Sequence, residues 1–407
     1  MTTVLRAVTE AANGPSPDTS GPDAAETVFL SPRRSLLGWG RALTIDIPAP
    51  WVENLHLVGE ALSRIEVDDR VGGTAATGPV AFAALPFDRE AAGSFIVPAV
   101  LRGSTPDGAY WVTRIDGAEI SAPSAADGEQ VDVDAMATEL RCAQPPEEWC
   151  ASVDIARHRI IDGGLAKVVL ARELIISADR PFDVARIAQR LAAAHPHSLR
   201  YCVEGFVGAS PELLVSRFGD VVRAQPMAGT TPRTGDAEAD HRRAAELLAS
   251  EKNRVEHQIT IDMVHETVLP WCSYLDAEPS PSVVAAGSVQ HLATLVEGRL
   301  SHPVPSVLDL VAALHPTPAV GGWPRAEAIR LIGELEPANR GRYAGPVGWV
   351  DAAGNGAWAV GIRGAEIDGA IARVFAGVGV VADSDPQAEL EETRAKFAAT
   401  LSSLVRL

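Results

Sequence analysis

The chain has 407 residues, of which 46% are hydrophobic, and its net charge is −18 because 53 acidic residues oppose 35 basic ones. That length allows one large domain or two to three ordinary ones. The acidic balance argues against nucleic acid or an anionic membrane as a partner, and no apolar run reaches the roughly 18 residues that a membrane helix needs.

The first 26 residues are small, polar and rich in Gly, Pro, Asp and Ser, with no apolar segment typical of a signal peptide. We therefore expect residues 1–26 to form a disordered tail. The four cysteines are Cys142, Cys150, Cys202 and Cys272, and they show neither a CxxC motif nor metal-ligand spacing. This spacing, together with the lack of an export signal, predicts reduced thiols in a cytoplasmic protein.

The region from residue 27 to 145 combines strand patterns with one helix. Strands are predicted within TVFLSPRRSLLGWGRALTIDI, GPVAFAALPFD, GSFIVPAVLRG and AYWVTRI, and a helix within VENLHLVGEALSRI. The segment SAPSAADGEQVDVDA, residues 121–135, predicts a loop or linker.

From residue 146 the pattern becomes more regular. We predict helices over 147–163 and 182–195, a strand over 166–174, a strand meander over 201–229 and one long helical stretch over 236–272. Helices and strands follow one another in mixed order with many hairpin signals. This order favours an α+β fold with mostly antiparallel sheets.

The segment PQAELEETRAK, residues 386–396, opens the last predicted helix, and Pro386 suits its first position. Glu389, Glu392 and Lys396 form a stripe roughly 110° around the helix from its apolar face. One interpretation is a solvated flank with an i,i+4 pair of Glu392 and Lys396; the other is a binding surface. The apolar face is predicted to contain Leu390, Phe397, Leu401 and Leu404.

Glu256 lies near the apolar face of the long helical stretch, beside Val255 and Ile259. A surface glutamate is one interpretation. Mg²⁺ prefers one or two protein carboxylates, several waters and an anionic substrate group. Glu256 and Glu389 on two facing helices would suit that preference.

The stretch GAWAVGIRGAEI, residues 356–367, reads as one strand with Trp358 and Ile362 on one face. The other face would carry Arg363 among small residues, either in solvent or against a flat ligand. Arginine is the natural bidentate partner of a carboxylate. Gly377 and Gly379 follow in FAGVGVV and offer backbone N–H groups to an anion, although a glycine hairpin is an equal interpretation.

Two further ionisable residues stand in apolar settings. Lys167 lies in the middle of a predicted strand, AKVVLAR, where a lysine is costly unless it pairs with an acid or acts as a general base. Glu212 follows Ser-Pro and precedes two leucines, and such a setting would raise its pKa and favour a general acid. Membership of structural ion pairs is the alternative for both residues.

The block from about residue 146 to 407 resembles the chorismate-utilising enzymes, which include isochorismate, salicylate, anthranilate and aminodeoxychorismate synthases. The resemblance is carried in order by KVVLAR, GASPELL, PMAGTTPR, SEKNRVEH, QHLATLVEG, HPTPAVGGWPR, AIRLIGELEP, RYAGPVGW, GNGAWAVGIR, FAGVGVVADSDP and ELEETRAK, and FLSPRRS extends it upstream. It implies an α+β (α/β) fold like that of anthranilate synthase component I, a large antiparallel β-sandwich with outer helices. Residues 146–407 would form the chorismate-binding catalytic domain, and 27–145 would add strands to the same body.

The resemblance also implies roles for single residues. Lys167 matches the lysine that activates water for attack at C2 of chorismate, and Glu212 matches the acid that protonates the departing C4 hydroxyl. Glu256 and Glu389 match ligands of a Mg²⁺ cofactor, with Glu392 reaching metal-bound water. The matching substrate-binding positions are Gly229, Thr230, His291, Ala319, Tyr343, Arg363, Gly379 and Lys396.

Two positions separate the branches of this family. The ammonia-using branches resemble this pattern but carry glutamine in place of Lys167, so lysine favours water as the nucleophile. Salicylate synthases tend to have threonine in place of Ala319. The resemblance therefore favours isochorismate synthase, whose product feeds menaquinone, siderophore and salicylate pathways.

Two alternatives stay open: a salicylate synthase, which adds pyruvate lyase activity, and a non-catalytic chorismate-binding regulator. Asn253 departs from the family, in which relatives usually carry an acid at this position. The resemblance implies chorismate as the small-molecule partner, no glutaminase subunit and a monomer.

Overall fold

The structure is a computed structural model, and it describes residues 4–12, 25–116, 138–287 and 289–404. The predicted loop or linker over 121–135 lies outside these residues, as does most of the predicted tail. Within the described ranges the chain forms three β-sheets with helices around them.

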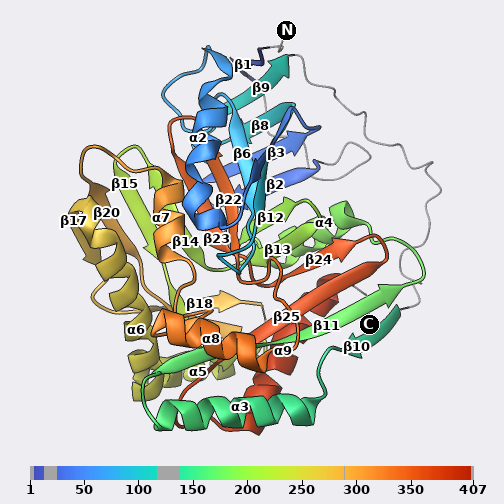
Figure 1. Ribbon diagram of the computed structural model, residues 1–407, viewed down its shortest axis with the longest axis vertical. Helices are drawn as coiled ribbons and strands as arrows, with labels where there is room; N and C mark the ends of the chain where they lie inside the picture. The colour runs from blue at the N-terminus through green and yellow to red at the C-terminus, as the bar shows by residue number, and fades with distance from the viewer. Residues whose placement is uncertain (1–3, 13–24, 117–137, 288, 405–407) are drawn as a thin grey trace.

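The largest sheet extends along the longest axis of the molecule, from β10 and β11 at the bottom of Figure 1 to β1 at the top. All its pairings are antiparallel except the parallel pairing of β1 with β5. Because β12 pairs with β2, the region 27–145 and the region 146–407 share this one sheet. Its strands, in spatial order and with β21 pairing off the path with β11, are β10 (Thr138–Cys142), β11 (Lys167–Ala178), β25 (Ile371–Val380), β24 (Gly364–Asp368), β13 (Phe206–Ser210), β12 (Leu199–Val203), β2 (Thr27–Ser31), β3 (Arg34–Trp39), β8 (Val100–Ser104), β9 (Tyr110–Asp116), β1 (Arg6–Ala11), β5 (Glu66–Asp69) and β21 (Gly322–Trp323).

The second sheet packs against the upper part of the first, and apolar side chains from both sheets fill the space between them. Its strands in order are β17 (Cys272–Ala277), β20 (Val296–Leu300), β15 (Val221–Gln225), β14 (Leu213–Phe218), β23 (Gly356–Val360), β22 (Pro346–Asp351), β6 (Val80–Ala84), β7 (Gly93–Val97) and β4 (Leu43–Ile47). A small third sheet contains β16 (Met227–Pro232), β19 (Val289–Ala293) and β18 (Ser282–Ala286). The inter-sheet core includes Phe29, Phe82, Trp111, Tyr201, Phe206 and Trp349.

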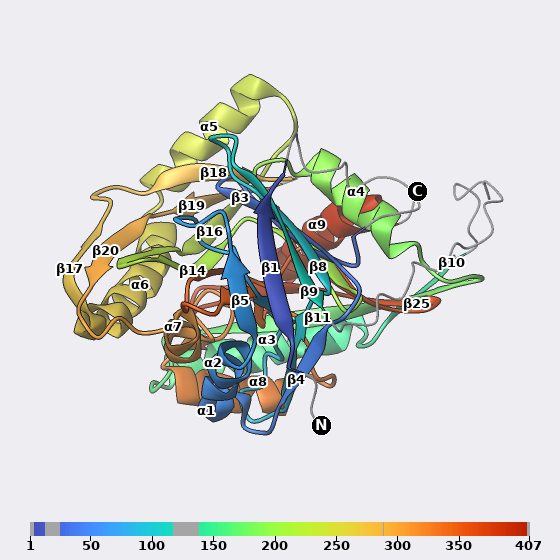
Figure 2. The same ribbon diagram turned by 90° about the horizontal axis from the view of Figure 1, so that it is seen from above.

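The helices lie on the outside of the sheets. Helices α4 and α9 contact each other and cover the outer face of the large sheet, where both contribute to a second apolar cluster (Figure 2). Helices α3 and α8 pack on β11, and α6 packs on β16. The helices are α1 (Trp51–Asn54), α2 (His56–Ser63), α3 (Pro146–Ile161), α4 (Val184–Ala194), α5 (Ala237–Ala249), α6 (Glu251–Val268), the 3₁₀ turn η2 (Leu269–Trp271), α7 (Val307–Leu314), α8 (Arg325–Leu335) and α9 (Pro386–Leu404).

Three local predictions are wrong. Residues Arg6–Ala11 are not a disordered tail but strand β1, which pairs with β5 and β9 and buries Ala7 completely.

The stretch 236–272 is not one helix, because extended backbone at Ser250 (φ −67°, ψ 113°) ends α5 and caps α6. An N-cap serine provides a local hydrogen bond that favours this break, since its hydroxyl accepts from the amide of Asn253.

The third wrong prediction is the single strand over 356–367. The chain forms β23 in the second sheet, crosses over, and continues as β24 in the large sheet. Both faces of β23 are buried, so alternation does not distinguish them. Likewise β11 is buried from Lys167 to Leu174 without alternation, because strands inside a layered fold are covered on both faces.

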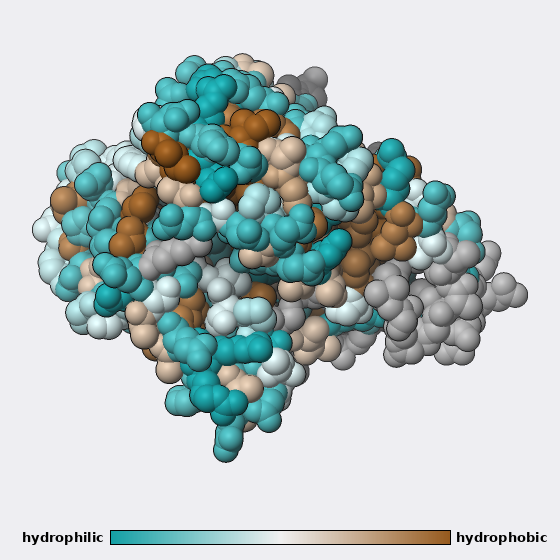
Figure 3. Space-filling model, turned by 90° about the horizontal axis from the view of Figure 1, so that it is seen from below, coloured by the Kyte–Doolittle hydropathy of each residue, from teal (hydrophilic) through white to brown (hydrophobic). Residues whose placement is uncertain are grey.

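The observed order of elements agrees with the predicted α+β class and its mostly antiparallel sheets. In the described part of the chain, no helix has the length and apolar character needed to cross a membrane. The face seen from below is mostly hydrophilic, with hydrophobic residues in small separated groups (Figure 3).

Candidate active site

A cavity of about 320 Å³ lies where β11 and β25 of the large sheet meet β16 and β19 of the small sheet and helices α6 and α9. Every residue that the sequence predicts for the site lines this cavity. They are Lys167, Glu212, Gly229, Thr230, Glu256, His291, Ala319, Tyr343, Arg363, Gly379, Glu389, Glu392 and Lys396.

Lys167 stands at the start of β11 and is 1% exposed. Its Nζ donates to Glu256 Oε1 on α6 across 2.7 Å. Gly379 on the neighbouring strand leaves room for this pair, since a Cβ there would lie 2.8 Å from Lys167 Cε and 3.0 Å from Glu256 Oε1. The side chain is therefore held in one place against the cavity wall.

Glu212 lies in the short connection between β13 and β14 and is 3% exposed. Burial raises its pKa to about 8, partly opposed by the positive charge of Lys167 and by the amide of Met227. Its Oε1 is buried and has no hydrogen-bond partner in the protein. A protonated carboxyl directed at a cavity is suited to donate a proton to a ligand, as the sequence predicts.

The predicted stripe of α9 faces the cavity. Lys396 Nζ donates to Glu392 Oε1 across 2.6 Å and to the carbonyl of Gly377 on β25 across 2.8 Å. Glu389, one turn before Glu392, is 8% exposed. The predicted i,i+4 pair therefore exists, but the stripe is not a solvated flank, because Lys396 is 12% exposed and all three residues line the cavity. The binding-surface interpretation stays a prediction. The apolar face of α9 is buried, as predicted, at Leu390, Phe397, Leu401 and Leu404.

Arg363 reaches the cavity from the crossover between the two large sheets. Its backbone has φ +57°, a left-handed conformation that is costly for a residue with a side chain. Tyr201 Oη donates to the carbonyl of Ile362 across 3.0 Å, and the amide of Ala209 donates to the carbonyl of Arg363. These contacts hold the crossover in the shape that directs Arg363 inward.

His291 connects Arg363 to the small sheet. Arg363 Nη2 donates to His291 Nε2 across 3.1 Å, so the ring proton is on Nδ1, which donates to the carbonyl of Gly229 across 3.2 Å. Burial, and then the charges of Arg363 and Lys396, hold the pKa of His291 well below its usual range. A neutral His291 with a fixed tautomer therefore orients one of the cavity's cations.

Gly229 has φ +73° at an irregularity in the pairing of β16 with β19, a conformation that favours glycine. A Cβ there would lie 3.1 Å from Asn253 Oδ1. Asn253 lines the cavity one turn before Glu256, and its Nδ2 donates to Ser250 Oγ across 2.9 Å. The cap that breaks the predicted long helix thus also fixes this amide.

The carboxylates of the cavity suit a magnesium ion in chemical type and in number. Glu256 and Glu389 face the same cavity from two helices, and Glu392 follows Glu389 by one turn. Among the described residues, no three His, Cys, Asp or Glu side chains converge on one point as a complete ligand set. Two protein carboxylates completed by waters and an anionic substrate are the usual surroundings of Mg²⁺.

The sequence prediction missed the apolar part of the lining. Phe375, which was not predicted, stacks on the predicted Tyr343, with ring centroids 5.1 Å apart and planes 16° from parallel. Val169, Val320 and Ile362 also contact the space. Phe375 shares β25 with the predicted Gly379, so its even spacing from that residue was a signal that it faces the same side.

Comparison with known proteins identifies the family of this chain. A family model described as chorismate binding enzyme matches residues 31–405. Isochorismate synthase DhbC of Bacillus subtilis (strain 168) is 37% identical over 338 residues, which cover 80% of this chain and 81% of the relative.

Solved structures of related enzymes are also similar to this chain. A putative 2,3-dihydroxybenzoate-specific isochorismate synthase, DhbC from Bacillus anthracis, has 35% identity and a TM-score of 0.80, covering 93% of this chain and 96% of its own. Anthranilate synthase component I from Streptococcus pneumoniae TIGR4 shares the fold at 22% identity, with a TM-score of 0.72 over 90% of this chain and 92% of its own. The predicted fold class is confirmed, and the chain belongs to the chorismate-binding enzyme family.

Proposed function

We propose that the protein is an isochorismate synthase, an isomerase that converts chorismate reversibly to isochorismate with Mg²⁺ as cofactor. The observation that carries this proposal is the meeting of Lys167 and Glu212 on one cavity. A lysine and a protonated carboxyl that line one cavity provide a general base and a general acid in the same space. Relatives named isochorismate synthase, with the identities given above, support the assignment.

Substrate binding follows from the charges that line the cavity. Chorismate carries two carboxylates, and Arg363 and Lys396 supply cations from the crossover and from α9. The fork of an arginine suits bidentate contact with one carboxylate. Ring atoms of the substrate would rest against the stacked pair of Tyr343 and Phe375, which closes one apolar side of the space.

The reaction adds water at one carbon and removes it at another. Lys167 Nζ accepts a proton from water as the water oxygen attacks C2. The ring double bonds shift, and Glu212 donates its proton to the C4 hydroxyl, which leaves as water. One water enters and one leaves, so the product is an isomer of the substrate and the reaction is reversible.

The metal would be held by Glu256 and Glu389, with Glu392 acting through a bound water. When bound, Mg²⁺ supplies positive charge that stabilises the electron density developing on the C1 carboxylate. The protein orients Lys167 and Glu256, because Gly379 has no side chain and so leaves the space in which the two meet.

We further propose that the enzyme acts as a monomer in the cytoplasm without a glutaminase subunit. Lys167 supports the last point, because water rather than ammonia would be the nucleophile. All four cysteines are free thiols, which suits a reducing compartment.

The test is ¹H NMR of chorismate incubated with the purified protein and Mg²⁺. We expect isochorismate signals that rise to a plateau, and no change when EDTA is present or when Lys167→Ala replaces the wild type. Salicylate and pyruvate as products would instead identify a salicylate synthase. Untouched chorismate would contradict the proposal and favour a non-catalytic chorismate-binding protein.

A further inference from the structure

The strand that carries Lys167 is only partly paired along its outer edge. Short β21 pairs with Lys167 and Val168, and β10 pairs with residues 174–178. Between them, the described strands leave the outer edge of β11 without a neighbour. Two side chains fill this gap: Arg340 Nη2 donates to the carbonyl of Val169 across 2.7 Å, and Glu336 Oε1 accepts from the amide of Ala171 across 2.8 Å.

Arg340 and Glu336 form a buried bidentate ion pair. Arg340 Nε donates to Glu336 Oε2 across 2.8 Å and Nη2 to Oε1 across 2.6 Å, with side chains 2% and 7% exposed. Burial lowers the pKa of Arg340, but Glu336 outweighs it and raises the pKa overall. The guanidinium also lies 4.3 Å from the ring centroid of Phe87. The arginine is therefore charged and fixed in one orientation.

The same arginine reaches two other walls of the cavity. Its Nη1 donates to the carbonyl of Val320 across 2.8 Å, beside Ala319. Its own carbonyl accepts from the amide of Tyr343 across 3.0 Å. Val169, Ala319, Val320 and Tyr343 all line the cavity, whereas neither Arg340 nor Glu336 does.

We propose that Arg340 and Glu336 are positioning residues for the reaction, which take the place of a strand behind β11 and fix Lys167 relative to Ala319 and Tyr343. This inference rests on the proposed function. Arg340 makes four hydrogen bonds from three separate nitrogens, whereas a lysine ammonium has three N–H donors on one nitrogen. Lysine would therefore lose at least one of the four bonds. The reacting groups would then be misaligned while the fold persists.

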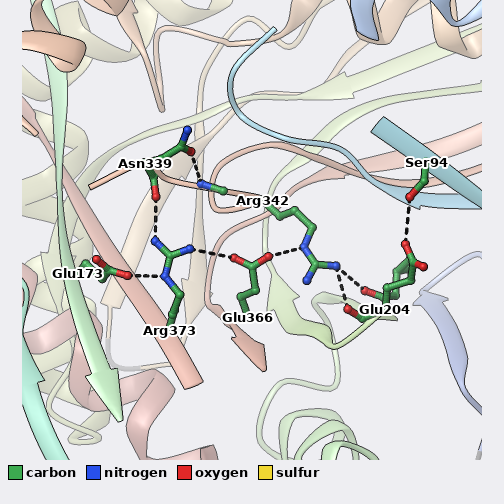
Figure 4. Close-up of polar contacts among 9 residues, drawn as sticks. Ser94, Glu173, Glu204, Asn339, Arg342, Glu366 and Arg373 are labelled. Atoms are coloured by element: carbon green, nitrogen blue, oxygen red, sulfur yellow. Dashed lines mark hydrogen bonds and ion pairs between the residues drawn. The ribbon is translucent and has the colours of Figure 1, made fainter. Parts of the chain in front are cut away.

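A matched control is Arg373 on β25, the strand that pairs with the inner edge of β11. Arg373 donates to Glu173 of β11, contacts Glu366 at 3.5 Å and donates to the carbonyl of Asn339 across 2.8 Å. Figure 4 shows these contacts continuing through Glu366 to Arg342 and Glu204. The hydrogen-bond and ion-pair partners of Arg373 do not line the cavity, although its guanidinium lies 5.2 Å from the ring centroid of Phe375, which does. Arg373→Lys keeps a cation near that ring, so it perturbs β11 while largely preserving the cavity wall.

The experiment compares Arg340→Lys, Glu336→Gln and Arg373→Lys with the wild type, with kcat and KM for chorismate expressed per folded protein. We expect Arg340→Lys to lower kcat about 10- to 100-fold while KM changes only a few-fold. Arg373→Lys should keep kcat within a few-fold of the wild type. Glu336→Gln retains an oxygen for the amide of Ala171, so it should fold and show an intermediate loss.

Hydrogen–deuterium exchange of the peptide covering residues 167–173 gives a readout that needs no turnover. We expect faster exchange in Arg340→Lys than in Arg373→Lys. Equal losses of kcat in these two variants, or unchanged exchange in Arg340→Lys, would overturn the positioning role. An inactive wild type whose exchange still responds to Arg340→Lys would contradict the proposed function alone.

Discussion

Two ion pairs contact strand β11, one at the cavity and one at the outer edge of the strand, and their side chains differ in exposure. On the cavity side, Lys167 Nζ meets Glu256 Oε1, and the glutamate side chain is 15% exposed. On the outer edge, Arg340 and Glu336 are 2% and 7% exposed, and they bond to each other and to three backbone groups.

This difference in exposure suits the Lys167–Glu256 pair to a role in the reaction and the Arg340–Glu336 pair to a structural role. A buried charge is tolerated when its hydrogen bonds are complete, as around Arg340. The first pair borders a space with room for water and an anion, and beside it the carboxyl of Glu212 keeps an oxygen without a protein partner. A cavity carboxyl whose pKa is strongly raised, as for Glu212, is typical of functional sites.

The largest effect is expected from the cavity-side pair. Lys167→Ala should lower kcat by about 10²–10⁴-fold, the usual contribution of a general base. The unfolding temperature should change little, because Glu256 borders the cavity and gains access to water there. Steady-state kinetics with thermal unfolding of the same preparation measures both quantities, and retained activity would remove Lys167 from the reaction.

Glu212→Gln should lower kcat about 10²-fold or more, since a general acid is lost while the shape is retained. In the wild type, the forward rate should fall as pH rises above about 8, because the proton of Glu212 is lost there. A pH–rate profile measures this limb, and an unchanged high-pH limb in Glu212→Gln would contradict the assignment.

The same carboxyl affects stability in a defined direction. The pKa of Glu212 is raised from 4.5 to about 8 on folding. Its contribution to the free energy of unfolding is therefore fully present below pH 4.5 and is lost as the pH rises towards 8. We expect Glu212→Gln to gain stability relative to the wild type between pH 5 and about 8. Denaturant unfolding at both ends of this range measures the gain, and a constant difference would contradict it.

A smaller effect is expected from the glycine beside the first pair. Gly379→Ala places a methyl group 2.8 Å from Lys167 Cε and should displace the lysine, lowering kcat/KM about 10-fold. Gly333→Ala on α8 is the control, since a Cβ there meets nothing within 4 Å. Equal activity of the two variants would show that the position of Lys167 is not critical.

The smallest effect concerns metal affinity. Asn253→Asp adds a carboxylate one turn before Glu256 and keeps an oxygen beside Gly229. We expect Mg²⁺ to bind a few-fold more tightly, as measured by titration calorimetry without substrate. Weaker binding would place residue 253 away from the metal.

Local patterns predict only part of the cavity, because Gly229, Thr230, His291, Ala319 and Tyr343 were predicted from the family resemblance alone. The stripe of α9 follows from helical periodicity, and the raised pKa of Glu212 follows from its apolar neighbours. The inward path of Arg363 was not predictable from alternation, because the residue lies on a crossover between sheets. The role of Arg340 depends on a gap between β10 and β21, which exists only after segments distant in sequence have paired.

The most direct test of the central claim is to run the reaction in H₂¹⁸O and locate the label in isochorismate by mass spectrometry and ¹³C NMR. If Lys167 activates water for attack at C2, early product carries one ¹⁸O, bonded to C2. Product without label, formed by transfer of the C4 hydroxyl within the substrate, would contradict the account of Lys167 and Glu212.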